Sequence, residues 1–161
     1  MKTIDAIERE LGEALPAMGS GAAAARWLLG LAEQVLEVWV TARGAVPTSE
    51  EREGFRLLAL HRQGAQDLAS FNACRETCRE ICYHYNLLAL PAPPAQAAQR
   101  LQMMGLLVRH LALFVGGKLE VERLGEFCCA SRPLRADDAK KGSDPFSQES
   151  AQLPPSQRKG I

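Results

Sequence analysis

The fold is decided by residues 22–42, which read AAAARWLLGLAEQVLEVWVTA. Alanine and leucine favour helix, and at about 100° per residue the charged and amide groups of this stretch share one narrow arc. These polar residues are Arg26, Glu33, Gln34 and Glu37. Apolar side chains spread over roughly 220° of the helix surface, so the helix must be covered on two sides. It is predicted to be the central helix of a bundle, or a helix shared between a core and an oligomer interface.

The charges in this stretch argue against a membrane span. A charged side chain at the middle of a bilayer costs several kcal/mol, so residues 22–42 are predicted to lie in a protein core. Residues 1–15 lack the basic start and the apolar run of a signal peptide. The sequence therefore predicts a cytoplasmic protein that does not enter a membrane. Five cysteines, three of them in one predicted helix, indicate reduced thiols and not a disulfide scaffold.

Composition extends the helical prediction to the rest of the chain. The sequence holds 24 alanines and 22 leucines against 7 valines and 4 isoleucines, a bias that disfavours a sheet. The predicted fold class is therefore all-α. A length of 161 residues suits one domain. We predict a helical bundle domain over residues 1–129 and a disordered polar tail over 130–161, because the tail is almost free of apolar residues.

The domain is predicted to be an antiparallel bundle of five to six helices. Their expected ranges are 4–15, 22–42, 48–72, 73–89, 94–115 and 118–129. Residues 118–122 also alternate as in a strand, but a helix is favoured for the last range because one short strand would have no partner. Thr3, a capping box that begins at Thr48, and Pro94 mark three helix starts, and Gly44 marks an end. Gly116-Gly117 is expected to end the fifth helix.

The junction near residues 70–72 has two interpretations. No Pro or Gly separates the helices on either side of it, yet the apolar stripe rotates between them. We predict a kink or a short break there, with Ser70 and Asn72 available as caps. The alternative is one helix of roughly 40 residues, which a small monomer could not cover.

Three cysteines form the most unusual motif. Cys74, Cys78 and Cys82 are spaced by four residues and share one helical face. Sulfurs at this spacing can chelate a soft metal ion, so Zn or Cu(I) is a possible cofactor. Cys128 and Cys129 could complete a tetrahedral set if the C-terminal segment packs back onto that helix.

The cysteine stripe also suits two other roles. Core packing is the favoured one, because apolar residues share the arc and free cysteine behaves as a small apolar side chain. The other role is that of a redox-sensing or reactive thiol, since His61 or His110 could meet the sulfurs in the fold. No recognisable oxyanion hole or substrate pocket accompanies them, so we do not expect an enzyme.

The predicted helix 94–115 carries a second anomaly. Leu106 and Leu113 lie seven residues apart on its polar side, with Gln102 and Arg109 interleaved. Two leucines in register predict a narrow seam for a partner helix. The alternative is burial beneath the first helix or beneath the last segment.

Charge narrows the class of partner. The chain has 19 basic and 19 acidic residues and no clustered basic face, so nucleic acid is not an expected partner. Our leading hypothesis is an adaptor, regulator or accessory subunit that acts through helix-face contacts with a protein partner or a second copy. The alternative is a thiol-based metal-binding or redox-sensing protein that uses Cys74, Cys78 and Cys82.

Overall fold

The computed structural model describes residues 2–19 and 21–122 of the chain. Within them it has five α-helices, two short 3-10 helices and no strand, so the all-α prediction is confirmed. The elements are α1 (Ile4–Ala14), η1 (Leu15–Ala17), α2 (Ala22–Ala42), α3 (Arg56–Gly64), η2 (Ala69–Cys74), α4 (Arg75–Leu88) and α5 (Pro94–Glu122). Among the described helices, none combines the length and the apolarity that crossing a membrane requires. The predicted boundary between a domain and a tail, at residues 129 and 130, lies outside the described residues.

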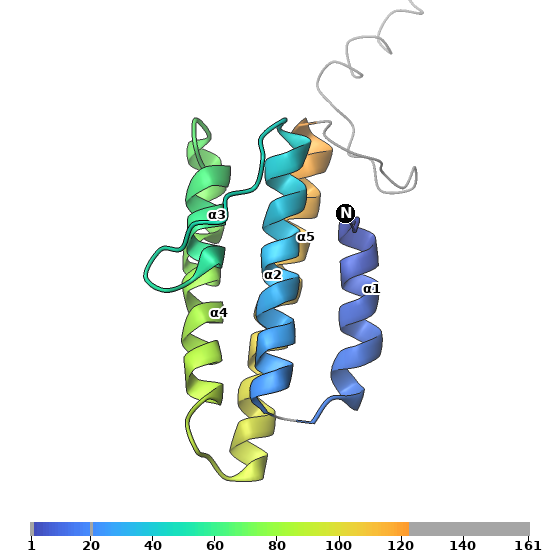
Figure 1. The fold of residues 1–161 in the computed structure, drawn as a ribbon. Coiled ribbons are helices and arrows are strands. Elements are labelled where there is room, and N and C mark those ends of the chain that lie inside the picture. The colour runs from blue at the N-terminus through green and yellow to red at the C-terminus, as the bar shows by residue number, and fades with distance from the viewer. Residues whose placement is uncertain (1, 20, 123–161) are drawn as a thin grey trace, which may run out of the picture. The chain divides into compact units, whose positions relative to one another are not determined.

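The helices lie roughly along one another, with α2 and α5 in the middle (Figure 1). In Figure 1, α1 lies on one side of this central pair, and α3 and α4 lie on the other. Successive helices α1 and α2 run in opposite directions, as do α4 and α5. However, α2 and α5 run in the same direction, so a fully antiparallel bundle is not confirmed. The two helices run in the same direction because the loop over residues 45–55 carries the chain back along α2 before α3 begins.

Several predicted helix ends are confirmed. The Thr3 hydroxyl accepts a hydrogen bond of 3.2 Å from the backbone N–H of Ala6, which makes Thr3 the N-cap of α1. The bounds of α2 are those predicted, and Gly44 follows it in the left-handed region, with φ of 79°. Pro94 is the first residue of α5.

The predicted helix start at Thr48 is wrong, because α3 begins only at Arg56. Thr48 instead lies in a loop that is held by two side chains of α3, one at the start of that helix and one near its end. Gln63 accepts from the Thr48 N–H at 2.9 Å and donates to the carbonyl of Val46, while Nε of Arg56 donates to the Thr48 carbonyl. These long-range bonds replace the local capping box, so the loop stays non-helical.

The predicted end of the fifth helix at Gly116-Gly117 is also wrong, because α5 continues to Glu122. Gly116 faces α1, where a Cβ in its place would lie 3.5 Å from Cγ2 of Ile4. Leu119, in the next turn, is buried. Packing of this turn therefore outweighs the low helix propensity of two glycines. Residues 118–122 belong to α5, and the rest of the predicted last helix lies outside the described residues.

The break predicted near residues 70–72 is confirmed, but it is wider than predicted, because α3 already ends at Gly64 and the 3-10 helix η2 follows. The predicted caps are wrong: neither Ser70 nor Asn72 caps a helix with its side chain. It places Phe71 in the core, where its ring stacks on Trp39 of α2 with centroids 4.7 Å apart. Nε1 of Trp39 donates to the carbonyl of Gly64, the last residue of α3, at 2.9 Å. Trp39 therefore fixes the end of α3 and the 3-10 helix η2 against α2.

Candidate functional site

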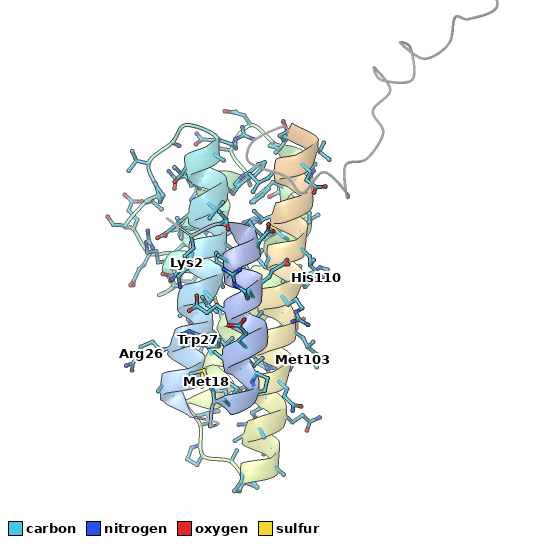
Figure 2. The ribbon with its side chains drawn as sticks, turned by 90° about the vertical axis from the view of Figure 1, so that its right-hand side faces the viewer. Lys2, Met18, Arg26, Trp27, Met103 and His110 are labelled. Atoms are coloured by element: carbon cyan, nitrogen blue, oxygen red, sulfur yellow. The ribbon has the colours of Figure 1, made fainter. Side chains whose placement is uncertain are left out.

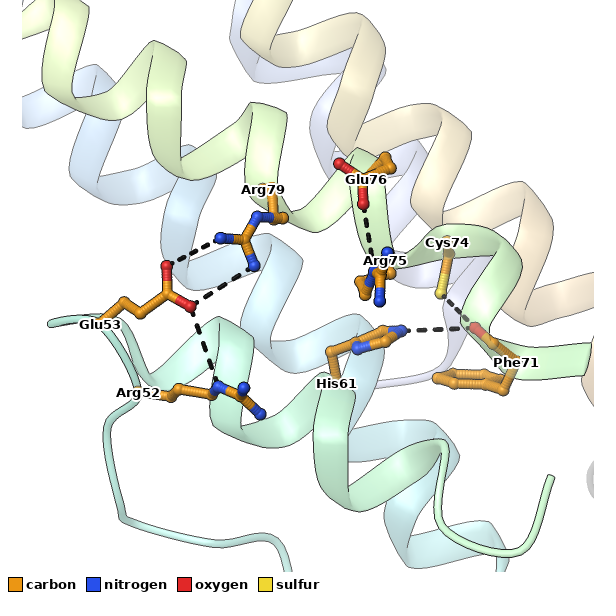
Figure 3. Close-up of polar contacts among 8 residues, drawn as sticks. All are labelled: Arg52, Glu53, His61, Phe71, Cys74, Arg75, Glu76 and Arg79. Atoms are coloured by element: carbon orange, nitrogen blue, oxygen red, sulfur yellow. Dashed lines mark hydrogen bonds and ion pairs between the residues drawn. The ribbon is translucent and has the colours of Figure 1, made fainter. Parts of the chain in front are cut away.

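The three cysteines of the sequence motif lie on the inward side of α4. Cys74 is the residue before the helix, and Cys78 and Cys82 follow one and two turns later. Their exposed fractions are 1%, 0% and 5%, and all three are free thiols. The Cys74 thiol donates to the carbonyl of Phe71 at 3.3 Å (Figure 3). The stripe thus belongs to the core between α4 and its neighbours.

His61 of α3 joins this cluster, as the sequence allowed. It is only 5% exposed, and its ring stacks on Phe71 with centroids 5.8 Å apart. Its Nε2 lies 3.4 Å from the carbonyl oxygen of Phe71, so His61 and Cys74 share one acceptor (Figure 3). His110, the other histidine considered for this role, lies on the exposed side of α5.

The surroundings shift the pKa values of the three thiols in different directions. A hydrogen bond from Cys78, with further help from His61, lowers the pKa of Cys74 to about 6 against the effect of burial. The pKa of Cys78 is raised, because its thiol donates to Cys74 and because it is buried. Burial, with the nearby charges of Glu33 and Glu53, raises the pKa of Cys82 to about 12. Cys74, the first residue of the stripe, is therefore the one of the three whose pKa is lowered, and its side chain is not accessible to solvent.

The structure supplies no ready metal centre in the part of the chain that it describes. Within residues 2–19 and 21–122, no group of three or more His, Cys, Asp or Glu side chains is arranged to hold one metal ion. The completing ligands suggested by the sequence, Cys128 and Cys129, lie outside the described residues. A Zn or Cu(I) site at Cys74, Cys78 and Cys82 stays a prediction.

A polar groove of about 950 Å³ lies between the 48–53 loop, α3 and the start of α4. It is lined by side chains of both charges, among them Glu50, Glu51, Arg52, Glu53, Arg62, Arg75 and Arg79. Glu53 pairs with Arg79 across the groove at 3.0 Å, while Arg75 pairs with its neighbour Glu76 (Figure 3). Sequence reasoning missed this groove, because it expected a helix over the residues that form the loop.

The backbone of the loop turns sharply at Glu53 and Gly54. Both residues have positive φ, 54° and 81°, and Arg52 and Phe55 exchange two backbone hydrogen bonds around them. Glycine tolerates this conformation, whereas glutamate is strained in it. The ion pair of Glu53 with Arg79 holds the strained turn against α4, so its evident role is to fix the loop.

The predicted interface residues lie on the outward side of α5. Leu106 and Leu113 are 59% and 58% exposed, and Gln102 and Arg109 are exposed beside them. Burial under the first helix, the alternative from sequence, is wrong. Instead, α1 and η1 pack on an adjacent side of α5, where Leu15 of η1 meets Gly105 and Ile4 of α1 meets Gly116. The alternative of burial under the last segment lies outside the described residues.

Two further apolar or small residues extend this row. Met103 is 43% exposed, and Gly117 is exposed with no atom within 4 Å of the position of a Cβ. We define the α5 stripe as Met103, Leu106, His110, Leu113 and Gly117. Figure 2 shows Met103 and His110 along the side of α5 away from α2. The alternating spacing of three and four residues was the signal in the sequence that could have found Met103 and Gly117.

Arg109 borders the α5 stripe but is turned toward α1. A Cβ placed on Gly12 of α1 would lie 3.5 Å from Nη2 of Arg109. The positive charge of Arg109 also opposes the burial and the Asp5 charge that raise the pKa of Glu8 in α1. Arg109 is therefore engaged with α1, and the α5 stripe itself contains no Asp, Glu, Lys or Arg.

No known protein family matches the chain, and no curated protein and no solved structure matches it either.

Proposed function

We propose that this chain is a small helical interaction protein, an adaptor, regulator or accessory subunit, and that the α5 stripe is its contact surface. The observation that carries the proposal is the exposure of Leu106 and Leu113, 59% and 58%, on one side of one helix. Large apolar side chains at helical spacing on a wet face are typical of helix-in-groove and coiled-coil contacts.

The energetics of burial support a contact of this kind. Covering each leucine completely would contribute about 1 to 2 kcal/mol, since part of each side chain is already shielded by its own helix. Met103 adds a flexible apolar side chain, which adapts to a partner surface. Gln102 and Arg109 border the row on the side of α1, and as exposed polar residues they belong to the rim of the proposed contact.

The thiol-based alternative has weaker support. Reactive thiols lie at partly exposed positions, whereas the exposed fractions of Cys74, Cys78 and Cys82 do not exceed 5%. Among the described residues, no group of three or more possible ligands is arranged to hold a metal ion. We assign these residues to core packing. Free, buried thiols also suit a reducing compartment, and we propose the cytoplasm as the location.

Site-specific photo-crosslinking in the source cells tests the proposal. A benzophenone amino acid replaces Leu106 or Leu113 and, as a matched control, Leu90, which has the same exposed fraction as Leu113, 58%, but lies outside α5. We expect covalent adducts from positions 106 and 113 and none from position 90, because only the α5 stripe is held against a partner. Absence of adducts at both stripe positions, or equal adducts at position 90, would contradict the proposal.

A further inference from the structure

We infer that the partner of the α5 stripe is a second copy of this chain, whose α5 lies antiparallel to the first. The inference rests on the proposed function and adds the identity of the occupant and its direction. It comes from the distribution of side-chain size along the α5 stripe. The spacing 103, 106, 110, 113 and 117 alternates between three and four residues, as in the seam of a helix pair.

The two ends of the α5 stripe are complementary to each other. Met103, at one end, is a long side chain with 43% exposure. Gly117, at the other end, leaves open space where a side chain would stand. In an antiparallel pair, Met103 of each copy approaches Gly117 of the other and fills that space. A parallel pair would instead set methionine against methionine and glycine against glycine, which leaves a void at one end.

The centre of the α5 stripe is compatible with the same two-fold arrangement. Leu106 and Leu113 lie four residues before and three residues after His110, so an antiparallel copy brings leucines against leucines within one helical turn. Both copies use the same surface, which closes the assembly as a dimer and prevents further growth. Arg109 is turned toward α1 in each copy, so its charge is not directed at the axis.

The direction of pairing can be tested by placing opposite charges at the two ends. Met103→Glu alone and Gly117→Lys alone should each weaken dimerisation, measured by sedimentation equilibrium of the full chain, by about tenfold or more. In an antiparallel dimer of the double variant, the new carboxylate at position 103 of each copy faces the new ammonium group at position 117 of the other. Association should therefore recover to within about threefold of the wild type. Both sites accept the change, because Met103 is partly exposed and Gly117 has open space around it.

The outcomes separate the inference from the proposed function. A double variant that associates more weakly than either single variant means parallel pairing and overturns the antiparallel arrangement. A wild-type chain that stays monomeric up to about 0.5 mM overturns the second copy as partner. If crosslinks from position 113 then join a different protein, the proposed function still stands. If they join nothing, both fall. Leu90→Glu, which alters an equally exposed leucine elsewhere, should leave dimerisation unchanged and controls for net charge.

Discussion

Gly64, the last residue of α3, packs directly against two aromatic rings of the core. A Cβ there would lie 2.8 Å from Cδ1 of Trp39 and 3.1 Å from Cε1 of Phe71. Both contacts are with ring atoms that cannot move away independently. We therefore expect Gly64→Ala to lower the free energy of unfolding by about 1 to 3 kcal/mol, measured by urea denaturation.

Gly30→Ala in α2 is the matched control for this substitution. Gly30 also lies in a helix, but a Cβ at its position would meet no other side chain within 4 Å. Alanine should raise the free energy of unfolding there by about 0.5 to 1 kcal/mol, through helix propensity alone. Equal effects of the two substitutions would show that the aromatic rings do not restrict residue 64.

Cys82 makes the stability of the folded chain decrease with rising pH in the alkaline range. Its pKa is about 12 in the folded chain and near 9.0 when unperturbed, so the unfolded thiol loses its proton first. The stabilisation by the protonated thiol is complete below pH 9 and is lost as the pH rises from 9 towards 12. We expect the free energy of unfolding to fall by up to about 1.4 kcal/mol per pH unit in that window from this group.

The substitution Cys82→Ala isolates the contribution of this thiol from that of every other group that ionises at alkaline pH. The variant starts from a lower stability, because it loses a buried sulfur, but its unfolding free energy should depend less steeply on pH above about 9. Denaturant unfolding at about pH 8, 9 and 10 measures both slopes. Parallel slopes for the variant and the wild type would mean that Cys82 is not protonated preferentially in the fold.

At the scale of elements, α5 continues through Gly116 because its packing outweighs the low helix propensity of glycine. Gly116 is helical, and a methyl group at its position would make an ordinary contact, 3.5 Å, with Cγ2 of Ile4. Gly116→Ala should therefore stabilise the chain by about 0.5 to 1 kcal/mol, measured by urea denaturation. If the chain instead broke at Gly116-Gly117 in a left-handed conformation, alanine would be strained and the variant would be less stable.

The loop before α3 shows which elements could be predicted from local pattern. The residues that follow Pro47 have the composition of a helix start, and a capping box uses only bonds within one turn. Gln63, fifteen residues after Thr48, accepts from the N–H of that residue, and the turn at Glu53 places two residues at positive φ. A local pattern contains no information on either of these, so the α3 start could not be placed from sequence. In α2, by contrast, caps, propensity and apolar pattern all agree, and its bounds were correct.

At the scale of the whole molecule, the dimer that we propose should couple self-association to folding. A dimer that forms only from folded chains raises the apparent stability as concentration rises, by about 2.7 kcal/mol at a hundred times the dissociation constant. We expect the Tm of the wild type to increase by several degrees between about 5 and 500 µM, measured by calorimetry.

Leu113→Glu is the control for this behaviour. Residue 113 is 58% exposed, so the variant should retain its helix content in circular dichroism while its Tm no longer depends on concentration. A variant that loses its helix content would place Leu113 in the core of the folded chain and remove it from the α5 stripe.

The sequence by itself determined the all-α class, the bounds of α2, the break before α4 and the common face of Cys74, Cys78 and Cys82. These features follow from propensity and from the period of one helix, which act over a few residues. Only the tertiary structure decided that α2 and α5 run in the same direction, that α5 passes through Gly116-Gly117, and that the side of α5 bearing Leu106 and Leu113 stays exposed. Each of these depends on contacts between residues far apart in the chain, such as Leu15 with Gly105, which settle the face of α5 that α1 covers.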